Sequence, residues 1–335
     1  MLTFTLRRLL LAIPTLLVIS LVIFLLVDLA PGSPMSEIPL TVPPDVRQKM
    51  IAAMGADQPV FVRYFLWLRQ FFWVEPATLF DGWFGTNLAG DEQRIVSWQS
   101  RSPVFTIIGQ RVPQTLTVIG TAYLVGILIA VPIGIYSAYR QYSWFDQAGT
   151  LFAMVGFSVP TFFSGTLFII IFAVWLGWFP TKYDTTLTVT DWQSFVKQMQ
   201  QMALPVMTLG LANAAAISRY MRSSMLENMG QDYVRTARAK GMSERTVVMK
   251  HVLRNSLIPV VTVIALGIPS IFGGAIITEN LFGVNGIGAA LIGAIHANDI
   301  PMVQTLAFIF AILIVVFNLI ADVLYGLLDP RIRYE

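Results

Sequence analysis

Long apolar runs separated by polar segments are the main pattern along this chain. Five runs are apolar and long enough to cross a bilayer, which takes about 20 helical residues. They are 9–30, 116–137, 148–176, 257–278 and 303–328. A sixth run, 202–221, is less hydrophobic and rich in Gly, Ala and Ser, and such small residues let helices pack closely inside a membrane bundle. The pattern predicts an all-α membrane protein with six transmembrane helices.

The third run contains Pro160 within 147–181, a stretch of 35 residues without a charge. A proline here either kinks one long helix or divides it into a re-entrant hairpin. Two crossings would move the basic loop 222–255 to the outer side, against the positive-inside rule. We therefore expect one long span that is tilted or kinked.

The first run lies near the amino terminus, as a signal peptide does, but it lacks the other features of one. Its 22 residues exceed the apolar core of such a peptide, and Pro31 follows Ala30 directly, with no small-x-small cleavage site. We expect this run to stay as a membrane anchor.

The Lys and Arg residues of the short loops predict the orientation. Six spans place both termini on one side, and 13 of the 22 Lys and Arg residues lie on that side. Short loops rich in these residues stay in the cytoplasm, whereas the long segment 31–112 is largely exempt from the rule. We expect a multi-pass inner-membrane protein with cytoplasmic amino and carboxyl termini.

The spans divide the chain into an amino-terminal transmembrane helix (1–30), an outer domain (31–112) and a five-helix core (113–335). Helices are predicted at 45–54 and 60–73 of the outer domain. In the second, aromatic and leucine side chains recur at intervals of three and four residues. Two interpretations stay open: an amphipathic helix at the lipid headgroups, or a helix packed on a small core of the domain.

The composition mainly excludes other classes of protein and site. Hydrophobic residues make up 56% and charged residues 12% of the 335 positions, and the mean hydropathy is +0.68; soluble domains carry about 25% charged residues. The absence of Cys excludes disulfides and thiolate sites, and a net charge of +3 gives no reason to expect nucleic acid. His251 and His296 are predicted on opposite sides of the membrane, which argues against an enzyme. No Lys follows a Gly, so a phosphate-binding loop for ATP is absent.

The inner loop 222–255 carries the strongest functional signal. Residues 231–240 are predicted to form a helix, Gly241 to stop it in the left-handed conformation, and Ser243 to cap a second helix. The small side chains at 237, 239 and 241, flanked by basic residues, suit a helix that enters a cleft on another protein. The alternative is a solvated loop whose charges only fix the topology.

Motifs along nearly the whole chain resemble one family. DYVRTARAKG (232–241), followed by RNSLIP (254–259), is similar to the cytoplasmic signature of ABC importer permeases, in particular the oligopeptide and dipeptide branch. Further matching strings follow in the expected order. They are FTLRRLL (4–10), APGSP (30–34), RVPQTL (111–116), PIGIYSA (132–138), GFSVPTFFSG (156–165), LGWFP (176–180) and LYGLLDPRIR (324–333). The sequence departs from the general signature at Arg235 and Thr236, which weakens only the match to importers in general. On the outer side, Ser33 stands where Asp is expected and the loop 181–201 is longer than typical, so the solute stays open.

The resemblance implies the fold of a type I ABC importer permease, whose core encloses half of a path for peptides or related small solutes. It also implies several partners: a homologous second permease, two ATP-binding subunits that carry ATP and Mg²⁺, an extracytoplasmic solute-binding protein and the lipid bilayer. By the same resemblance, the segment 231–246 couples to the ATPases. The residues assigned to coupling are Tyr233, Arg235, Thr236, Ala237, Arg238, Ala239, Lys240, Gly241, Arg245 and Lys250.

An ion-coupled secondary transporter is the alternative function. Such a carrier needs ionisable groups near the middle of the membrane, and only Asp322 is moderately deep. This carboxylate is either part of the path or a hydrogen-bonding group between helices. The candidates for lining the path are Thr262, Ser270, Thr278, Asn318 and Asp322.

Overall fold

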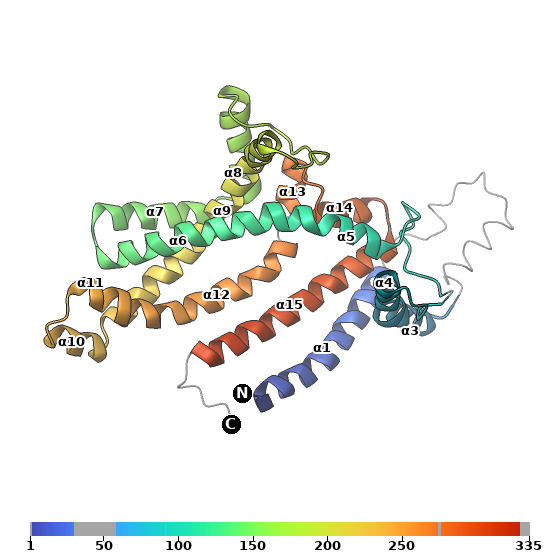
Figure 1. Cartoon of the computed structure of the whole chain (residues 1–335), viewed down its shortest axis with the longest axis horizontal. Helices are drawn as coiled ribbons and strands as arrows, with labels where there is room; N and C mark the ends of the chain where they lie inside the picture. The colour runs from blue at the N-terminus through green and yellow to red at the C-terminus, as the bar shows by residue number, and fades with distance from the viewer. Residues whose placement is uncertain (1, 30–57, 91, 274–275, 329–335) are drawn as a thin grey trace. The chain divides into compact units, whose positions relative to one another are not determined.

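The computed structural model describes residues 2–29, 58–90, 92–273 and 276–328, which are mainly helical (Figure 1). Internal contacts divide the chain into two compact units. The first contains Met1–Leu11, Val112–Ala289 and Leu313–Glu335, and the second contains Ala12–Arg111 and Ala290–Ile312.

The first unit is organised around its longest helix, α9 (Trp192–Met229), which packs along α6 (Thr121–Tyr139) (Figure 1). A glycine permits this close approach, because a Cβ on Gly134 would lie 2.5 Å from the Cβ of Met221. Small residues bring the two backbones together where lipid supplies no hydrophobic drive. The prediction that 202–221 packs inside the bundle is confirmed.

Helix α9 begins at Trp192, earlier than the apolar run predicted, because a capping box starts it. The Ser194 N–H donates to the Asp191 carboxylate at 2.7 Å, and the Ser194 Oγ accepts from the Asp191 N–H at 3.0 Å. The bond from the Ser194 backbone also lowers the pKa of Asp191.

The helix before α6 is longer than the apolar run suggests. Helix α5 (Val104–Thr115) continues through a π-helical turn, η2 (Leu116–Gly120), into α6 without a break. Together they form the 36-residue candidate span Val104–Tyr139.

The third apolar run is two helices rather than one kinked helix. Helix α7 (Trp144–Ser158) ends before Val159 and Pro160, and α8 (Thr161–Phe168) continues as the π-helical turn η3 (Ile169–Trp175). The two parts meet at 105°. Pro160 lacks an N–H, and its ψ of 140° is extended, which explains why the expected single span is broken at this residue.

The inner loop and residues 276–296 contain short helices that the hydropathy pattern missed. The inner loop folds into α10 (Asp232–Ala239), α11 (Glu244–Thr246) and η4 (Val247–Val252), which leads directly into α12 (Leu253–Gly273). Helices α13 (Ile276–Phe282) and α14 (Ile287–His296) meet at 90° where the sequence predicts a loop. Each is too short to give the signal of a span.

The second unit contains most of α1 (Leu2–Asp28), the start of α15 (Ile300–Leu328) and one continuous helix, 60–84. That helix comprises α3 (Val60–Arg69), η1 (Gln70–Val74) and α4 (Glu75–Phe84). The predicted helix at 60–73 is confirmed, and the one at 45–54 lies outside the described residues.

An aromatic core joins these helices of the second unit. Tyr64, Trp67 and Phe71 are buried on one side of helix 60–84. The Tyr64 ring lies 5.4 Å from Phe24 on α1, and the Phe71 ring lies 4.9 Å from Phe308 on α15, measured between centroids. Helix 60–84 therefore packs on α1 and α15 within its own unit. Both partner helices lie outside the predicted domain 31–112, so neither of the two interpretations included them.

Among the described residues, five helices are long and apolar enough to cross a membrane, or up to seven if each bent pair is one span. The five are Thr5–Asp28, Val104–Tyr139, Trp192–Met229, Glu244–Pro269 and Ile300–Leu324. The six predicted spans lie within this range, and a helical multi-pass fold is confirmed. The predicted domain limits at residues 30 and 112 stay predictions.

Candidate functional site

The inner loop folds as its local sequence predicts. Helix α10 ends at Ala239, and the turn after it contains Gly241, which has a φ of +78° and whose N–H donates to the Arg238 carbonyl at 2.9 Å. The Ser243 Oγ then accepts from the Thr246 N–H at 3.4 Å and caps α11. We call residues 232–246, with α10, the turn and α11, the inner hairpin (Figure 1).

One face of the inner hairpin is fixed to the membrane helices. Val234 and Ala237 are buried, and they belong to one apolar cluster with Met221 and Met225 of α9 and Val248 of η4. The spacing of three residues puts both side chains on one face of α10. A displacement of α10 would therefore be transmitted directly to α9 and to η4, the start of α12.

This burial corrects one residue of the predicted contact surface. From the sequence, Ala237 belongs with Ala239 and Gly241 to a small face for another protein. The Ala237 side chain is only 5% exposed and packs inside this chain, so it is not available to another protein. Ala239 and Gly241 are exposed, and a Cβ on Gly241 would meet open space. In this chain, backbone conformation rather than crowding requires glycine at 241.

The opposite face of the hairpin is exposed and basic. Tyr233 is half-buried, and its hydroxyl lies 2.7 Å from the Asn228 Oδ1, to which it donates. The other predicted coupling residues are exposed. They are Arg235, Thr236, Arg238, Ala239, Lys240, Gly241, Arg245 and Lys250.

A two-pronged ion pair closes the hairpin. The Arg238 Nη2 lies 2.6 Å from the Glu244 Oε1, and the Nε lies 3.1 Å from Oε2. The Glu244 carboxylate raises the pKa of the Arg238 guanidinium. This bidentate geometry ties α10 to α11 across the turn.

Two buried serines fasten the helices on either side of the hairpin. The Ser224 Oγ of α9 donates to the Ser256 carbonyl at 2.9 Å, and the Ser256 Oγ of α12 lies 3.2 Å from the Ser224 carbonyl. Both side chains are buried, so water does not compete for these bonds. Helices α9 and α12 are thus linked close to the hairpin, and neither serine was identified from the sequence.

A buried ion pair links α9 to α7. The Arg222 Nε and Nη2 lie 2.5 and 2.8 Å from the Asp146 carboxylate oxygens, and the Tyr142 N–H donates to the same carboxylate at 2.9 Å. Asp146 is 3% exposed. From the sequence, Arg222 contributes only to the count of charges that sets the topology. The signal for its partner is an isolated Asp three residues after Ser143, which caps α7.

A buried carboxylate holds the short helices α13 and α14. Glu279 accepts from the Thr115 Oγ1 at 2.7 Å and from the Ala289 N–H at 2.9 Å, and the Thr115 Oγ1 accepts from the Ile287 N–H at 2.9 Å. A Cβ on Gly286 would overlap this carboxylate. The predicted fifth span ends at residue 278, just before Glu279, and the sequence gives this carboxylate no role because its partners come from distant segments.

The candidates for lining the path are spread over three helices. Thr262 is half-buried on α12 and Thr278 is buried on α13, whereas Asn318 on α15 is exposed. Ser270 lies on α12, but its side chain is outside the described set. Asp322 forms an ion pair with Arg8 of α1. This pairing favours the structural interpretation of Asp322 over a role in the path.

Within the described parts of the chain, no group of three or more His, Asp or Glu side chains is placed to hold a metal ion. The candidate site consists of the exposed face of the inner hairpin and the buried bonds behind it.

Comparisons with known proteins agree with this architecture. Residues 130–334 match the family described as "Binding-protein-dependent transport system inner membrane component", and residues 1–119 match the amino-terminal part of the corresponding membrane component. The oligopeptide transport system permease protein AppB of Bacillus subtilis is 36% identical over 338 residues, covering 100% of both chains. The glutathione transport system permease protein GsiC of Salmonella choleraesuis is 37% identical over 339 residues, again covering 100% of both chains. This chain belongs to the family of inner-membrane components of binding-protein-dependent transport systems.

Proposed function

We propose that this chain is a permease subunit of an ATP-driven importer and encloses half of the path for peptides or related small solutes. Family membership and full-length similarity to oligopeptide and glutathione permeases support this function over an ion-coupled secondary transporter. The observation that carries the proposal is the inner hairpin, which has one face anchored in the membrane helices and one face exposed.

The hairpin would transmit the movement of an ATPase. A partner that grips Arg235, Ala239 and Lys240 moves α10 as a rigid unit, because Val234 and Ala237 lock its other face to the membrane helices. The bonds between Ser224 and Ser256 would then carry the displacement into α9 and α12 together. Arg245 and Lys250 are exposed further along the same segment and would supply supporting contacts.

ATP hydrolysis belongs to separate subunits in this proposal. None of the five Lys residues follows a Gly, so the chain has no phosphate-binding loop. Two ATP-binding subunits would supply ATP and Mg²⁺, a homologous permease the other half of the path, and an extracytoplasmic binding protein the solute. The hairpin and both termini would then lie in the cytoplasm, as the Lys and Arg count predicts.

The residues that line the path remain part of the proposal. Thr262, Ser270 and Thr278 on α12 and α13, with Asn318 on α15, are the polar candidates. Asp322 is the weakest candidate, because Arg8 already neutralises its charge.

The test places bulk on the exposed face of the hairpin. Gly241→Val and Ala239→Trp should abolish uptake of labelled di-, tri- and pentapeptides and of glutathione, and stimulated ATP hydrolysis by the complex should fall in parallel. Overpacking a close contact typically costs about 1–3 kcal/mol. Both variants should insert at normal levels, since neither position touches the core.

Gly177→Val is the matched control. Gly177 also has a positive φ, +63°, and open space around it, but it lies on the predicted outer side. Gly177→Val should impose the same backbone strain as Gly241→Val without uncoupling transport. Normal uptake by the Gly241 and Ala239 variants, together with a dead Asp322→Asn variant, would refute the coupling role and favour an ion-coupled carrier.

A further inference from the structure

Helix 60–84 of the second unit has partners for all of its charges. Arg63 lies 2.6 Å from Asp28 of α1, and Arg69 pairs with Glu92. At the end of the helix, the Asp81 carboxylate accepts from the Leu88 and Ala89 N–H groups, both at 2.8 Å, and from the Thr86 hydroxyl.

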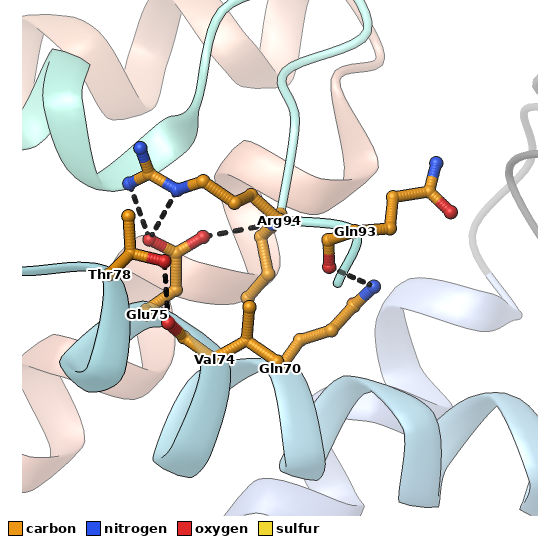
Figure 2. Close-up of polar contacts among 7 residues, drawn as sticks. Gln70, Val74, Glu75, Thr78, Gln93 and Arg94 are labelled. Atoms are coloured by element: carbon orange, nitrogen blue, oxygen red, sulfur yellow. Dashed lines mark hydrogen bonds and ion pairs between the residues drawn. The ribbon is translucent and has the colours of Figure 1, made fainter. Parts of the chain in front are cut away.

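The fourth charge, Glu75, is the most completely enclosed. Its carboxylate accepts from the Arg94 Nη2 at 2.6 Å, from the Arg94 Nε at 3.2 Å and from the Ile95 N–H at 2.9 Å. Figure 2 shows the Arg94 side chain folded over Glu75, while Gln70 reaches the Gln93 carbonyl one turn away, at 3.1 Å. Glu75 is fully buried. The charge of Glu75 is thus enclosed within the chain.

The exposed face of this helix is almost wholly apolar. Its one charged member, Arg69, is the partner of Glu92. Large aromatic side chains are exposed along the full length. Six of them are Phe61, Phe65, Phe72, Trp73, Phe80 and Trp83. A soluble protein rarely exposes such a continuous apolar surface without a partner.

Contacts with α1 fix the depth of the helix. The Tyr64 hydroxyl lies 2.8 Å from the Ser20 Oγ, and the Tyr64 ring packs on Phe24. Ser20 lies eight residues before Asp28, the end of the apolar span Thr5–Asp28, which places it about 12 Å inside that end at 1.5 Å per residue. Helix 60–84 therefore begins beside the span and not beyond it.

Resting on the membrane assignment above, we propose that helix 60–84 is immersed in the lipid leaflet at the end of α1 marked by Asp28, with its aromatic face against acyl chains. A helix lying at the headgroups would turn its charges to water. Here the charges turn to partners in the chain, which is how ionisable groups are accommodated at membrane depth. Trp73 and Trp83 are residue types favoured near the interface.

The test measures the medium around single positions in this naturally Cys-free chain. Nitroxide labels on Phe65→Cys, Phe72→Cys and Phe80→Cys would be examined in the complex with its co-purifying subunits, in vesicles of phosphatidylethanolamine and phosphatidylglycerol. Collisions with oxygen report lipid, and collisions with a water-soluble nickel chelate report water. Val18→Cys on the exposed side of α1 is the lipid reference, and Asn87→Cys after the helix is the water reference.

We expect the three positions to behave like Val18, with frequent oxygen collisions and few nickel collisions. The Phe65 label should report a depth close to that of a label at Val18. Frequent nickel collisions, as at Asn87, would overturn the proposal in favour of a water-facing surface. Few collisions with either oxygen or the nickel chelate would overturn the proposal in favour of a protein partner, such as a second permease or a binding protein.

The unsubstituted protein gives a second measurement. Lipids with a photoreactive group in the acyl chain should label the exposed residues Phe65, Phe72 and Trp83 and leave Tyr64 and Trp67 unlabelled. Absence of labelling in 60–84, with α1 labelled, would overturn the proposal. Neither experiment measures uptake, so lipid contact would stand even if the coupling role of the inner hairpin were refuted.

Discussion

The inner hairpin and helix 60–84 have the same construction with opposite exposed faces. Each buries one side in the apolar core of its own unit, through Val234 and Ala237 in the first and Tyr64 and Trp67 in the second. The exposed face of the hairpin is mostly polar and basic. The exposed face of helix 60–84 is aromatic, and its charges are held by partners in the chain.

The difference shows that the treatment of charge distinguishes a surface for a soluble protein from a surface for lipid. On the hairpin, Arg235 and its partner Asp232 are both largely exposed, so water screens them and they contribute specificity more than stability. On helix 60–84, Glu75 has no access to water and depends on Arg94. Loss of a charge partner should therefore be costly in one region and nearly silent in the other.

The largest expected effect comes from breaking the buried pair. Glu75→Ala leaves Arg94 and the Ile95 N–H without their acceptor, and removal of one partner of a buried pair typically costs about 3–5 kcal/mol. We expect a sharp fall in the apparent melting temperature of the purified protein in detergent and in its yield in membranes. Asp232→Ala, which removes the exposed partner of Arg235 on the hairpin, is the matched control and should have little effect. Equal losses in the two variants would contradict the distinction between the two faces.

An arginine placed on each exposed face gives the next largest effect. Phe65→Arg puts an unpaired charge on the proposed lipid face, where a charge costs about 2–4 kcal/mol at the bilayer midplane and less toward the interface. Ala239→Arg puts the same charge on the hairpin, where a surface substitution usually changes stability by about 0.5 kcal/mol or less. We expect the first variant to insert poorly, and the second to insert normally but lose uptake. If Phe65→Arg inserts normally but loses uptake and Ala239→Arg inserts poorly, the assignments are reversed: the hairpin faces lipid and helix 60–84 faces a protein.

Local rules allowed much of the hairpin to be predicted. Gly241 in the left-handed region and Ser243 as a cap follow from residue type and position alone, and both were found as predicted. Burial of Ala237 was missed, although it stands three residues after Val234 on the face that leads back to the chain. The small side chain of Ala237 suggests contact with another protein, whereas the periodicity of α10 assigns Ala237 to the core.

The tertiary contacts could not be predicted from the sequence. The pairs Glu75–Arg94, Asp146–Arg222 and Arg8–Asp322 join segments up to 314 residues apart, and no local pattern specifies which opposite charges will meet. Pro160 announces a break in the third run, but the 105° angle depends on how α8 packs afterwards, which includes contacts with α9 and α13.

Replacement of Gly241 should have a moderate effect on stability that separates backbone strain from coupling. The left-handed backbone conformation costs a residue with a Cβ about 1–2 kcal/mol of conformational free energy, and the cost is smaller for Asn. Because nothing lies near the missing Cβ, Gly241→Ala should lower the melting temperature only modestly and Gly241→Asn less still. If Gly241→Asn retains stability but loses uptake, the contact at this position is with a partner. Equal uptake by Asn and Gly would instead restrict the role of Gly241 to ending α10.

The smallest expected effect concerns the ion pair that closes the hairpin. Arg238→Ala removes a bidentate contact with Glu244 whose members are 43% and 42% exposed, so solvent screening limits the loss to about 0.2–1 kcal/mol. The loss should shrink further in high salt, since exposed pairs are screened over roughly 10 Å at 0.1 M ionic strength. Arg235→Ala is the control, because its 3.4 Å contact with Asp232 is longer and more exposed, and it should leave the melting temperature unchanged. A melting temperature that falls as far as in Glu75→Ala would mean that the Arg238–Glu244 pair is shielded from water. The exposed face of the hairpin would then already be covered in the purified protein.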